Sequence, residues 1–432
     1  MQNNATNAYY GSGTSLTNNH AKCLNSAVVP FAMYEMTRER LIEDLVEAYY
    51  DCRKNKKSKI DCVKFELRLE DNIVKLAEEI FERKYEISPS KVFIVNYPVK
   101  REIFASDFRD RVVHHYISLR IEPLMEKLFI DDSYNCRKGK GTSYGIARLY
   151  NEIDRVSNNW KYTAYCYSID IEGFFMSIDQ DLLWKKVERF IKREYRGNDE
   201  EILLYLLKKV VYDKPQENCI RVCSKDEWIG LKPSKSLFGV KGNKGVSLGK
   251  LSSQLLANFY LAVMDIKVKD KVDFYCRYVD DIRLIDKDKA RLERAVKLIE
   301  RNLKGMKLKM HPKKCRVQEV HKGIKFIGAY IMPHRLYITN RVRNKFYNKI
   351  LCINKQNEDG ELDIRKAVAT INSYLGMMRC YQTYNIRLSC FGAIDKEIKK
   401  SMYGTKHLYS VKLNKEIKNK IRLWQEQKLW EQ

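Results

Sequence analysis

Two acidic segments, each at the end of a predicted strand, constrain the fold of this chain most. Residues 275–284 contain Tyr278-Val279-Asp280-Asp281 in a strand, turn, strand context. Two neighbouring aspartates at a hairpin tip repel each other and are tolerated easily only in solvent or around a cation. Residues 168–175 place Asp170 at the end of another apolar strand, 280 − 170 = 110 positions earlier. A solvated turn would explain the first segment alone, whereas both segments together predict one site with three carboxylates.

Three carboxylates in this arrangement predict nucleotidyl transfer. On adjacent strands they can bind two magnesium ions about 4 Å apart, activate a 3′ hydroxyl and stabilise a leaving pyrophosphate. Magnesium suits this chemistry because it prefers hard oxygen ligands and accepts substrate phosphates. We therefore expect Asp170, Asp280 and Asp281 to be both metal ligands and catalytic residues, with two Mg2+ ions as cofactor and Mn2+ as a substitute.

The predicted elements mix helices and strands. Apolar residues recur at helical spacing in residues 37–54, 68–84, 110–128, 181–195, 200–212, 252–269, 290–303 and 365–432. Strands are predicted at residues 91–99, 162–171 and 274–285, with two short ones in 323–337. A polar stretch at 354–361 predicts the boundary before a helical C-terminal end. This order indicates an α+β fold, a sheet with helices on one face.

The charge balance indicates a polyanionic partner. The chain has 432 residues, with 81 Lys and Arg against 55 Asp and Glu, which gives a net charge of +26. The basic residues are dispersed, which favours an extended nucleic-acid channel over a basic arm. Residues 1–7 lack the features of a signal peptide, and no apolar run reaches the roughly 18 residues of a membrane span. We expect a soluble, cytoplasmic protein with no membrane partner.

The acidic segments belong to a series of motifs that resembles bacterial reverse transcriptases. The further segments that match the family, in the family's order, are residues 100–104, 107–115, 132–142, 248–258, 310–315, 323–328 and 371–376. The pair Ser253-Gln254 is similar to that of diversity-generating retroelement enzymes, which we favour. Antiphage defence reverse transcriptases share much of this motif set and are the alternative. Lys250 and Ser252 depart from the pattern, because relatives often have Asn and Thr there.

The resemblance implies a right-hand polymerase with fingers, a palm built on an antiparallel sheet, and a helical thumb. The expected parts are a tail at 1–28, fingers at 29–160, a palm at 161–334 with part of the fingers inserted between its catalytic strands, and a basic thumb at 335–432. The implied activity is RNA-directed DNA polymerase, which extends a primer with dNTPs along a retroelement or defence RNA. Expected partners are template RNA, the cDNA product, and a basic accessory protein or a second defence protein.

The resemblance also assigns four nucleotide-binding residues, which are Arg101, Phe175, Gln254 and Lys314. The guanidinium of Arg101 suits the triphosphate, with Lys100 as its competitor. Phe175 stands at the steric gate that rejects a ribose 2′-OH, and a core aromatic is the alternative. The amide of Gln254 would face the incoming nucleotide. Lys314 would lie near the leaving pyrophosphate as a general acid, with Lys313 as its competitor.

Basic and glycine residues indicate contacts with nucleic acid. Arg137, Lys138 and Lys140 flank glycines in a loop that we expect to contact the template backbone, with a solvated loop as the alternative. An ATPase is disfavoured because the loop lacks the full P-loop string. Phe326 and Gly328 lie in the segment that resembles the primer grip.

Two rival functions remain at this stage. One is a nucleic-acid-binding protein with an inactive site, which the intact set of three aspartates disfavours. The other is an RNA-templated RNA polymerase, which would accept ribonucleotides.

Overall fold

The computed structural model describes residues 36–96 and 99–430, with side chains to residue 423. The predicted tail, residues 1–28, lies outside the described residues. The α-helices are α1 Arg38–Arg53, α2 Ile60–Glu66, α3 Leu69–Phe81, α4 Phe108–Leu128, α5 Thr142–Val156, α6 Phe174–Ser177, α7 Gln180–Glu194, α8 Glu200–Val211, α9 Leu251–Lys269, α10 Lys289–Gly305, α11 Asn340–Glu358, α12 Ile364–Met378, α13 Tyr384–Gly392, α14 Lys396–Lys400 and α15 Lys415–Trp430. The strands are β1 Ser90–Val95, β2 Arg101–Ala105, β3 Tyr165–Asp170, β4 Cys219–Arg221, β5 Phe274–Tyr278, β6 Asp281–Asp286, β7 Arg316–Glu319, β8 Ile324–Phe326, β9 Ala329–Met332, β10 Arg335–Ile338, β11 Met402–Gly404 and β12 Val411–Leu413.

Side-chain caps fix where several predicted helices begin. Thr37 Oγ1 accepts a hydrogen bond from the backbone N–H of Arg40 at 3.2 Å, at the start of α1. Aspartates take the same role before α4, α7, α10 and α12, namely Asp107, Asp179, Asp288 and Asp363. A cap satisfies backbone N–H groups that have no partner inside the helix. The periodic segments therefore begin within two or three residues of their predicted starts.

A four-stranded antiparallel sheet in the order β5-β6-β3-β7 carries the acidic segments. Successive side chains of a strand point to opposite faces. Accordingly, Tyr275 and Leu284 belong to the cluster that includes α9 and α10, whereas Cys276 and Ile285 belong to the cluster that includes α5.

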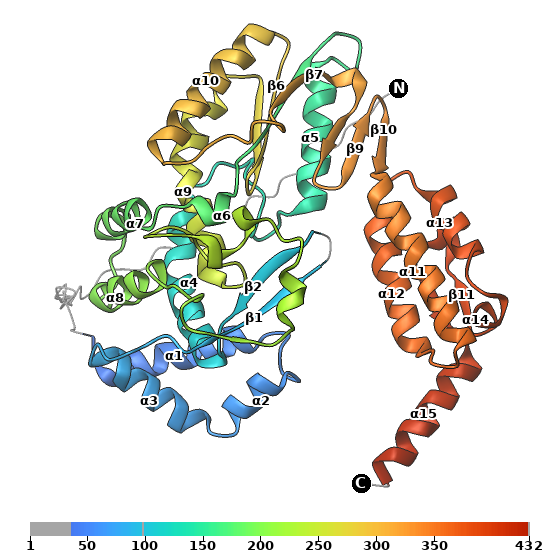
Figure 1. The fold of residues 1–432 in the computed structure, drawn as a ribbon, viewed down its shortest axis with the longest axis horizontal. Coiled ribbons are helices and arrows are strands. Elements are labelled where there is room, and N and C mark those ends of the chain that lie inside the picture. Colours follow the sequence, from blue (N-terminus) through green and yellow to red (C-terminus); the bar gives the residue numbers. More distant parts are fainter. Residues whose placement is uncertain (1–35, 97–98, 431–432) are drawn as a thin grey trace, which may run out of the picture. The chain divides into compact units, whose positions relative to one another are not determined.

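Both faces of this sheet are thus covered, as Figure 1 shows for α10 and α5. The expectation of helices on one face only is wrong. The antiparallel sheet β10-β9-β8 contributes to the α5 side. It contains three strands where the sequence predicted two.

A three-stranded sheet in the order β2-β1-β4 belongs to the N-terminal half of the described chain. β1 pairs antiparallel with β2 and parallel with β4. Helices α1, α3 and α4 pack together next to it through buried apolar residues, among them Leu41, Leu45, Leu76 and Ile117. The apolar residues of β1 and β2 themselves, Val92 and Phe104, lie in a smaller cluster with Met176 and Leu237.

In the C-terminal part, α11 to α14 with β11 and β12 share a separate core. That core includes Phe346, Ile350, Ile371 and Leu375, and Phe346 stacks on Tyr374 with ring centroids 4.8 Å apart. The predicted boundary at 354–361 is wrong, because α11 continues through it to Glu358. A purely helical end is also wrong, because β11 and β12 form an antiparallel pair.

Within the described residues, none of the helices combines the length and apolarity that crossing a membrane requires.

Candidate active site

The register of the four-stranded sheet brings the predicted carboxylates together. β3 and β6 pair antiparallel with Asp170 opposite Asp281. Asp280 occupies the tip of the β5–β6 hairpin, and its carbonyl accepts a hydrogen bond from the N–H of Ile171 at 3.2 Å. The backbone positions of the three aspartates therefore lie close together at the end of β3 and the tip of the β5–β6 hairpin.

Burial and mutual repulsion dominate the electrostatics of this edge. Burial, followed by the nearby charge of Asp170, raises the pKa of Asp280 to about 6. Burial also raises the pKa of Asp281. The ion pair with Arg283 opposes this rise. Lys314 Nζ lies 3.0 and 2.9 Å from the two carboxylate oxygens of Asp170. Cationic side chains thus neutralise two of the three carboxylates.

The donor chemistry of this site fits divalent metal ions. Carboxylate oxygens are hard ligands of the kind that Mg2+ prefers, and their mutual repulsion favours a bound cation. In the side-chain arrangement described for residues 36–96 and 99–423, no group of three or more His, Cys, Asp or Glu is gathered closely enough to hold a metal. Lys314 and Arg283 instead contact the carboxylates.

The hairpin that carries Asp280 has an unusual backbone conformation. Val279 has φ +58°, a value that a β-branched residue rarely adopts and that costs of order 1–3 kcal/mol. Both peptide groups of Val279 are held from outside the turn. Its N–H donates to Asn135 Oδ1 at 2.9 Å, and its carbonyl accepts from Arg277 Nη1 at 3.0 Å. These two hydrogen bonds stabilise the conformation that places Asp280.

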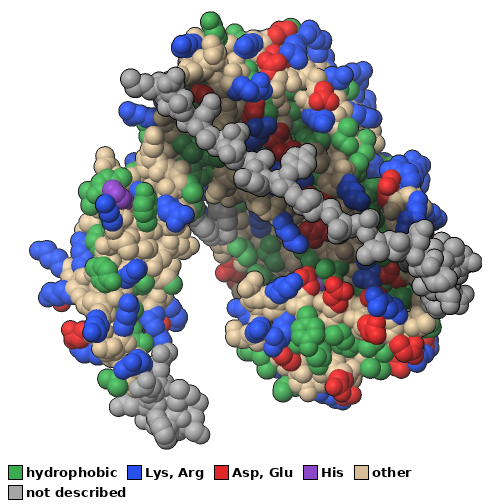
Figure 2. All heavy atoms as spheres, turned by 180° about the vertical axis from the view of Figure 1, so that it is seen from behind, with side chains coloured by type: hydrophobic (Ala, Val, Ile, Leu, Met, Phe, Trp, Pro, Cys, Tyr) green, Lys and Arg blue, Asp and Glu red, His purple; other side chains and the backbone are tan. Residues whose placement is uncertain are grey.

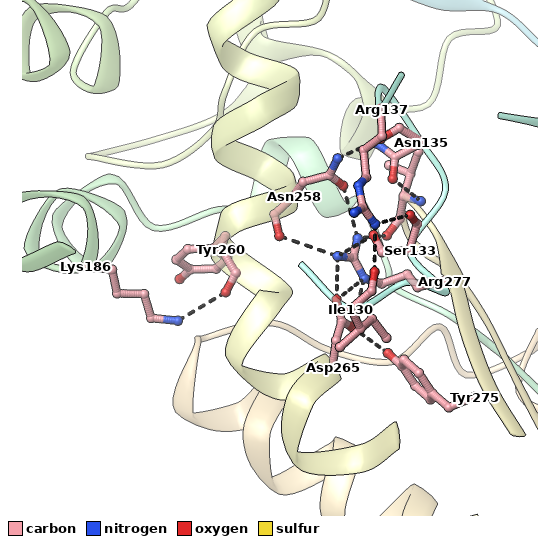
Figure 3. A network of polar contacts seen from close by, with 11 residues as sticks. Ile130, Ser133, Asn135, Arg137, Lys186, Asn258, Tyr260, Asp265, Tyr275 and Arg277 are labelled. Carbon is pink, nitrogen blue, oxygen red and sulfur yellow. Dashed lines mark hydrogen bonds and ion pairs between the residues drawn. The ribbon is translucent and has the colours of Figure 1, made fainter. Parts of the chain in front are cut away.

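A buried ionic network supports this hairpin from behind (Figure 3). Arg277 has an exposed fraction of 0% and lies in β5, one residue before Tyr278. Its Nε and Nη2 donate to Asp265 of α9 at 2.9 and 2.6 Å, and its Nη1 donates to Asn258 Oδ1 at 3.2 Å. The hydroxyl of Tyr275 also donates to Asp265, at 2.6 Å. The network joins α9 to the acidic hairpin.

Sequence reasoning missed Arg277 and Asp265. A signal was available, because an arginine inside an apolar strand and an aspartate inside an apolar helix each need a buried partner. Which of the aspartates pairs with Arg277 depends on how α9 packs on β5, and the sequence pattern does not contain that information.

A model of the reverse transcriptase (RNA-dependent DNA polymerase) family matches residues 99–331, more than half of the chain. The chain belongs to the reverse transcriptase family. As a member it is classed as an RNA-directed DNA polymerase, a nucleotidyltransferase, and its mixed helices and antiparallel sheets form the right-hand polymerase fold.

Other comparisons are distant. None of the curated proteins matches the chain. Among solved structures, apo telomerase from Candida tropicalis, truncated from its C-terminal domain, matches with a TM-score of 0.40 and 13% identity. The match covers 58% of this chain and 55% of the telomerase chain.

Three of the four residues expected to bind the nucleotide are close to the aspartates. Phe175 lies five positions after Asp170 in the sequence, and Arg101 and Lys314 lie close in the fold. Phe175 is half-buried and packs against the core, whereas its neighbour Phe174 is buried in the core at 2% exposure. Arg101 is exposed on β2, close enough to Asp280 to counteract the rise in its pKa. Lys314, not Lys313, contacts Asp170.

Gln254, the fourth expected contact, is half-buried on α9. Its Oε1 accepts a hydrogen bond from the thiol of Cys136 at 2.9 Å. Cys136 itself has φ +54° and precedes the basic loop. Sequence reasoning assigned no role to Cys136, and we see no sequence signal that would have paired it with Gln254.

Arg137 of the basic loop does not have the exposed side chain that a template contact requires. The side chain of Arg137 is only 6% exposed and donates to Glu126 and to the carbonyls of Ile130 and Ser133. The prediction that Arg137 faces the template is therefore wrong, because its donors are used within the protein. Lys140 forms an ion pair with Asp131, whereas Lys138 is exposed.

The segment expected to form the primer grip lies in the β8–β9 hairpin. Phe326 is 1% exposed and packs under the guanidinium of Arg283, 5.2 Å from its ring centroid. The prediction of direct nucleic-acid contact is thus wrong for Phe326, which is a core residue. Gly328 is exposed at the turn with φ +93°.

Both departures from the family pattern in residues 248–258 have buried partners. Lys250 is buried and forms an ion pair with Asp213. Ser252 Oγ lies 2.8 Å from His114 Nδ1, and His114 Nε2 lies 3.3 Å from Ser106 Oγ. These departures are accommodated by structure outside the motif, so they do not disrupt the start of α9.

Proposed function

We propose that the protein synthesises DNA on an RNA template, extending a primer with dNTPs by means of two divalent metal ions, Mg2+ or Mn2+. The observation that carries this proposal is the register that sets Asp170 opposite Asp281 beside Asp280, inside the segment that matches the family. Asp170, Asp280 and Asp281 would hold the ions. When bound, the ions activate the primer 3′ hydroxyl and neutralise charge on the phosphates.

In this proposal the remaining site residues orient the nucleotide and move a proton. Arg101 binds the triphosphate as a bidentate donor, and the half-buried ring of Phe175 excludes a ribose 2′-OH. Lys314 Nζ leaves Asp170 and protonates the departing pyrophosphate. The separate core of the C-terminal part supports a thumb at 335–432. We further propose fingers at 29–160 and a palm at 161–334, whose apolar residues share a core.

Primer extension on an RNA template tests the proposal. We expect Asp170→Asn and Asp280→Asn each to lower the rate by at least about 1,000-fold, because they remove charge at the reacting phosphates without a change in volume. Asp270→Asn is the matched control, since Asp270 is an exposed carboxylate at the end of α9. Undiminished extension by either active-site variant, at equal thermal stability, would contradict the mechanism.

Sugar selection separates this function from RNA-templated RNA synthesis. We expect Phe175→Ala to raise ribonucleotide incorporation about 10- to 200-fold, the range for one steric contact in a pocket. Efficient ribonucleotide use by the wild type, unaltered by Phe175→Ala, would favour an RNA polymerase instead.

For the biological role we propose a diversity-generating retroelement enzyme that acts with a basic accessory protein. The pair Ser253-Gln254 supports this choice. An antiphage defence enzyme, acting with a second defence protein, is the alternative. Sequencing of the RNA that co-purifies with the protein distinguishes them. A template with a variable copy nearby would support diversification, and a short structured RNA copied repeatedly would support defence.

A further inference from the structure

The segment between α8 and α9, residues 212–250, is anchored to the fingers strand β2 by a buried carboxylate. Glu102 of β2 has an exposed fraction of 0%. Its oxygens accept hydrogen bonds from Trp228 Nε1 at 2.6 Å, Ser236 Oγ at 2.8 Å and the N–H of Leu237 at 2.8 Å. These three hydrogen bonds hold the segment in place, because the three donors and the buried carboxylate would lose their partners if the segment moved away. The neighbour of Glu102 on β2 is Arg101.

The same segment also contacts α6, the short helix that follows β3. The 3-10 turn Pro233–Lys235 packs against α6, which follows Asp170. Gly173, at the start of α6, has φ +54°, and a Cβ placed there would lie 3.0 Å from the carbonyl oxygen of Ser234. Only glycine therefore combines this backbone conformation with this close approach. Contacts on both sides thus hold the turn that carries Lys235, whose side chain is exposed, between β2 and α6.

Lys235 experiences the charges of the active site directly. Its side chain interacts electrostatically with Lys314, Arg101 and Lys232, and also with Asp170. Burial is the main cause that lowers the pKa of Lys235, and the three cations add to that effect. Lys235 is thus repelled by Lys232 of its own turn and by two cations from elsewhere, Arg101 of β2 and Lys314. Such an arrangement is stabilised when a polyanion lies among them.

We propose that Lys235 binds the polyphosphate tail of the incoming nucleotide and the pyrophosphate that leaves it. Glu102 acts as a positioning residue, because it fastens the segment that carries Lys235 next to Arg101. Arg101 and Lys314 were expected to contact phosphate from the sequence, whereas Lys235 belongs to a segment to which the sequence assigned no function. This inference rests on the proposed nucleotidyl transfer and extends it.

Pyrophosphate binding and nucleotide kinetics test the inference separately from activity. Calorimetry with inorganic pyrophosphate and Mg2+ measures the phosphate contact whether or not the protein polymerises. We expect Lys235→Gln to weaken pyrophosphate binding and to raise the KM for dNTPs, each by at least about 10-fold, as for one charge-assisted hydrogen bond. Lys235→Arg should restore both to within about 3-fold. Glu102→Gln should change both in the same direction by a smaller factor.

The control variant is Lys225→Gln, which removes an exposed lysine from the same segment. We expect it to change neither constant, and we expect none of the variants to change the Kd for template–primer without nucleotide. Unchanged pyrophosphate binding in Lys235→Gln would overturn the inference. So would a loss confined to template–primer binding, which would make Lys235 a backbone contact. A wild type that binds pyrophosphate but incorporates no nucleotide would overturn the proposed function and leave the phosphate contact standing.

Discussion

Arg277 and Asp265 form a buried ion pair that supports the acidic hairpin. Their exposed fractions are 0% and 1%. Removal of one partner from a buried pair leaves an uncompensated charge and costs about 3–5 kcal/mol, whereas removal of both costs less. The pair also holds the carbonyl of Val279 in a conformation that the residue would otherwise avoid. Stability and catalysis should therefore be coupled at this residue.

We predict that Arg277→Met lowers the free energy of unfolding by about 3–5 kcal/mol and that Arg277→Met combined with Asp265→Leu restores part of it. Urea unfolding of the wild type, both single variants and the double variant measures this coupling. Arg277→Met and the double variant should both lose primer extension, because each lacks the guanidinium that binds the carbonyl of Val279. Additive losses in the double variant would contradict the coupling.

The buried side chain of His114 should make the free energy of unfolding sensitive to acid. It is buried in α4, where the hydroxyls of Ser106 and Ser252 satisfy its two ring nitrogens when it is neutral. Burial, with smaller contributions from Lys250 and His115, lowers its pKa from 6.5 to about 3. The unfolded chain therefore binds a proton between these values while the folded chain does not. The contribution of neutral His114 to the free energy of unfolding is therefore fully present above pH 6.5 and is lost as the pH falls towards 3.

We expect this histidine to contribute a slope of about 1.4 kcal/mol per pH unit between pH 6 and 4, the value for one proton. His114→Asn should remove that contribution from the pH dependence of urea unfolding. The control is His407→Asn, which replaces an exposed histidine and should leave the slope as in the wild type. An equal slope in the wild type and His114→Asn would show that the burial of His114 does not govern acid sensitivity.

At the scale of elements, one asparagine joins a helix to a hairpin in the C-terminal part. Asn372 of α12 donates to the carbonyl of Val411 at 2.9 Å and accepts from its N–H at 2.7 Å. Val411 is buried in β12. The side chain thus replaces the backbone partner that an added strand would supply. Residues 371–376, one of the segments that match the family's motifs, lie here, inside α12.

We predict that Asn372→Leu lowers the free energy of unfolding by about 1–3 kcal/mol, because it leaves both groups of a buried peptide unpaired. Hydrogen exchange at the amide of Val411 should become faster, while exchange in α9 stays unchanged. Asn372→Asp is the matched control, since it keeps the acceptor and should retain protection at Val411. Equal exchange at Val411 in the wild type and Asn372→Leu would contradict this role.

At the scale of the whole molecule, the net charge of +26 acts through its distribution. On the face drawn in Figure 2, Lys and Arg side chains are spread over the surface, with Asp and Glu among them. Many cations are paired, as Arg137 is with Glu126 and Lys140 with Asp131. The number of cations that can bind phosphates is therefore smaller than the composition indicates.

We predict that template–primer binding weakens about 100-fold between 50 and 200 mM salt, as expected for roughly four phosphates neutralised by the protein. Fluorescence anisotropy at constant Mg2+ measures the slope. Lys138→Gln should reduce it by about one phosphate, whereas Arg137→Lys should change stability more than the slope. A slope near zero would exclude a backbone-dominated interface.

The sequence by itself determined the family resemblance and most of the elements. Two strand ends with carboxylates, the caps and the helical periodicities are local signals, so Asp170, Asp280 and Asp281 could be named before any packing was known. Whether a basic or aromatic residue faces solvent is not local. Arg137 and Phe326 looked like surface contacts, and the tertiary structure buries both.

Only the tertiary structure decided which distant residues meet. Arg277 pairs with Asp265, Asn135 holds Val279, and Glu102 accepts hydrogen bonds from the segment that carries Lys235. Each of these contacts satisfies a polar or charged group removed from water. A sequence shows that such a group needs a partner, but the partner is chosen by how strands and helices pack.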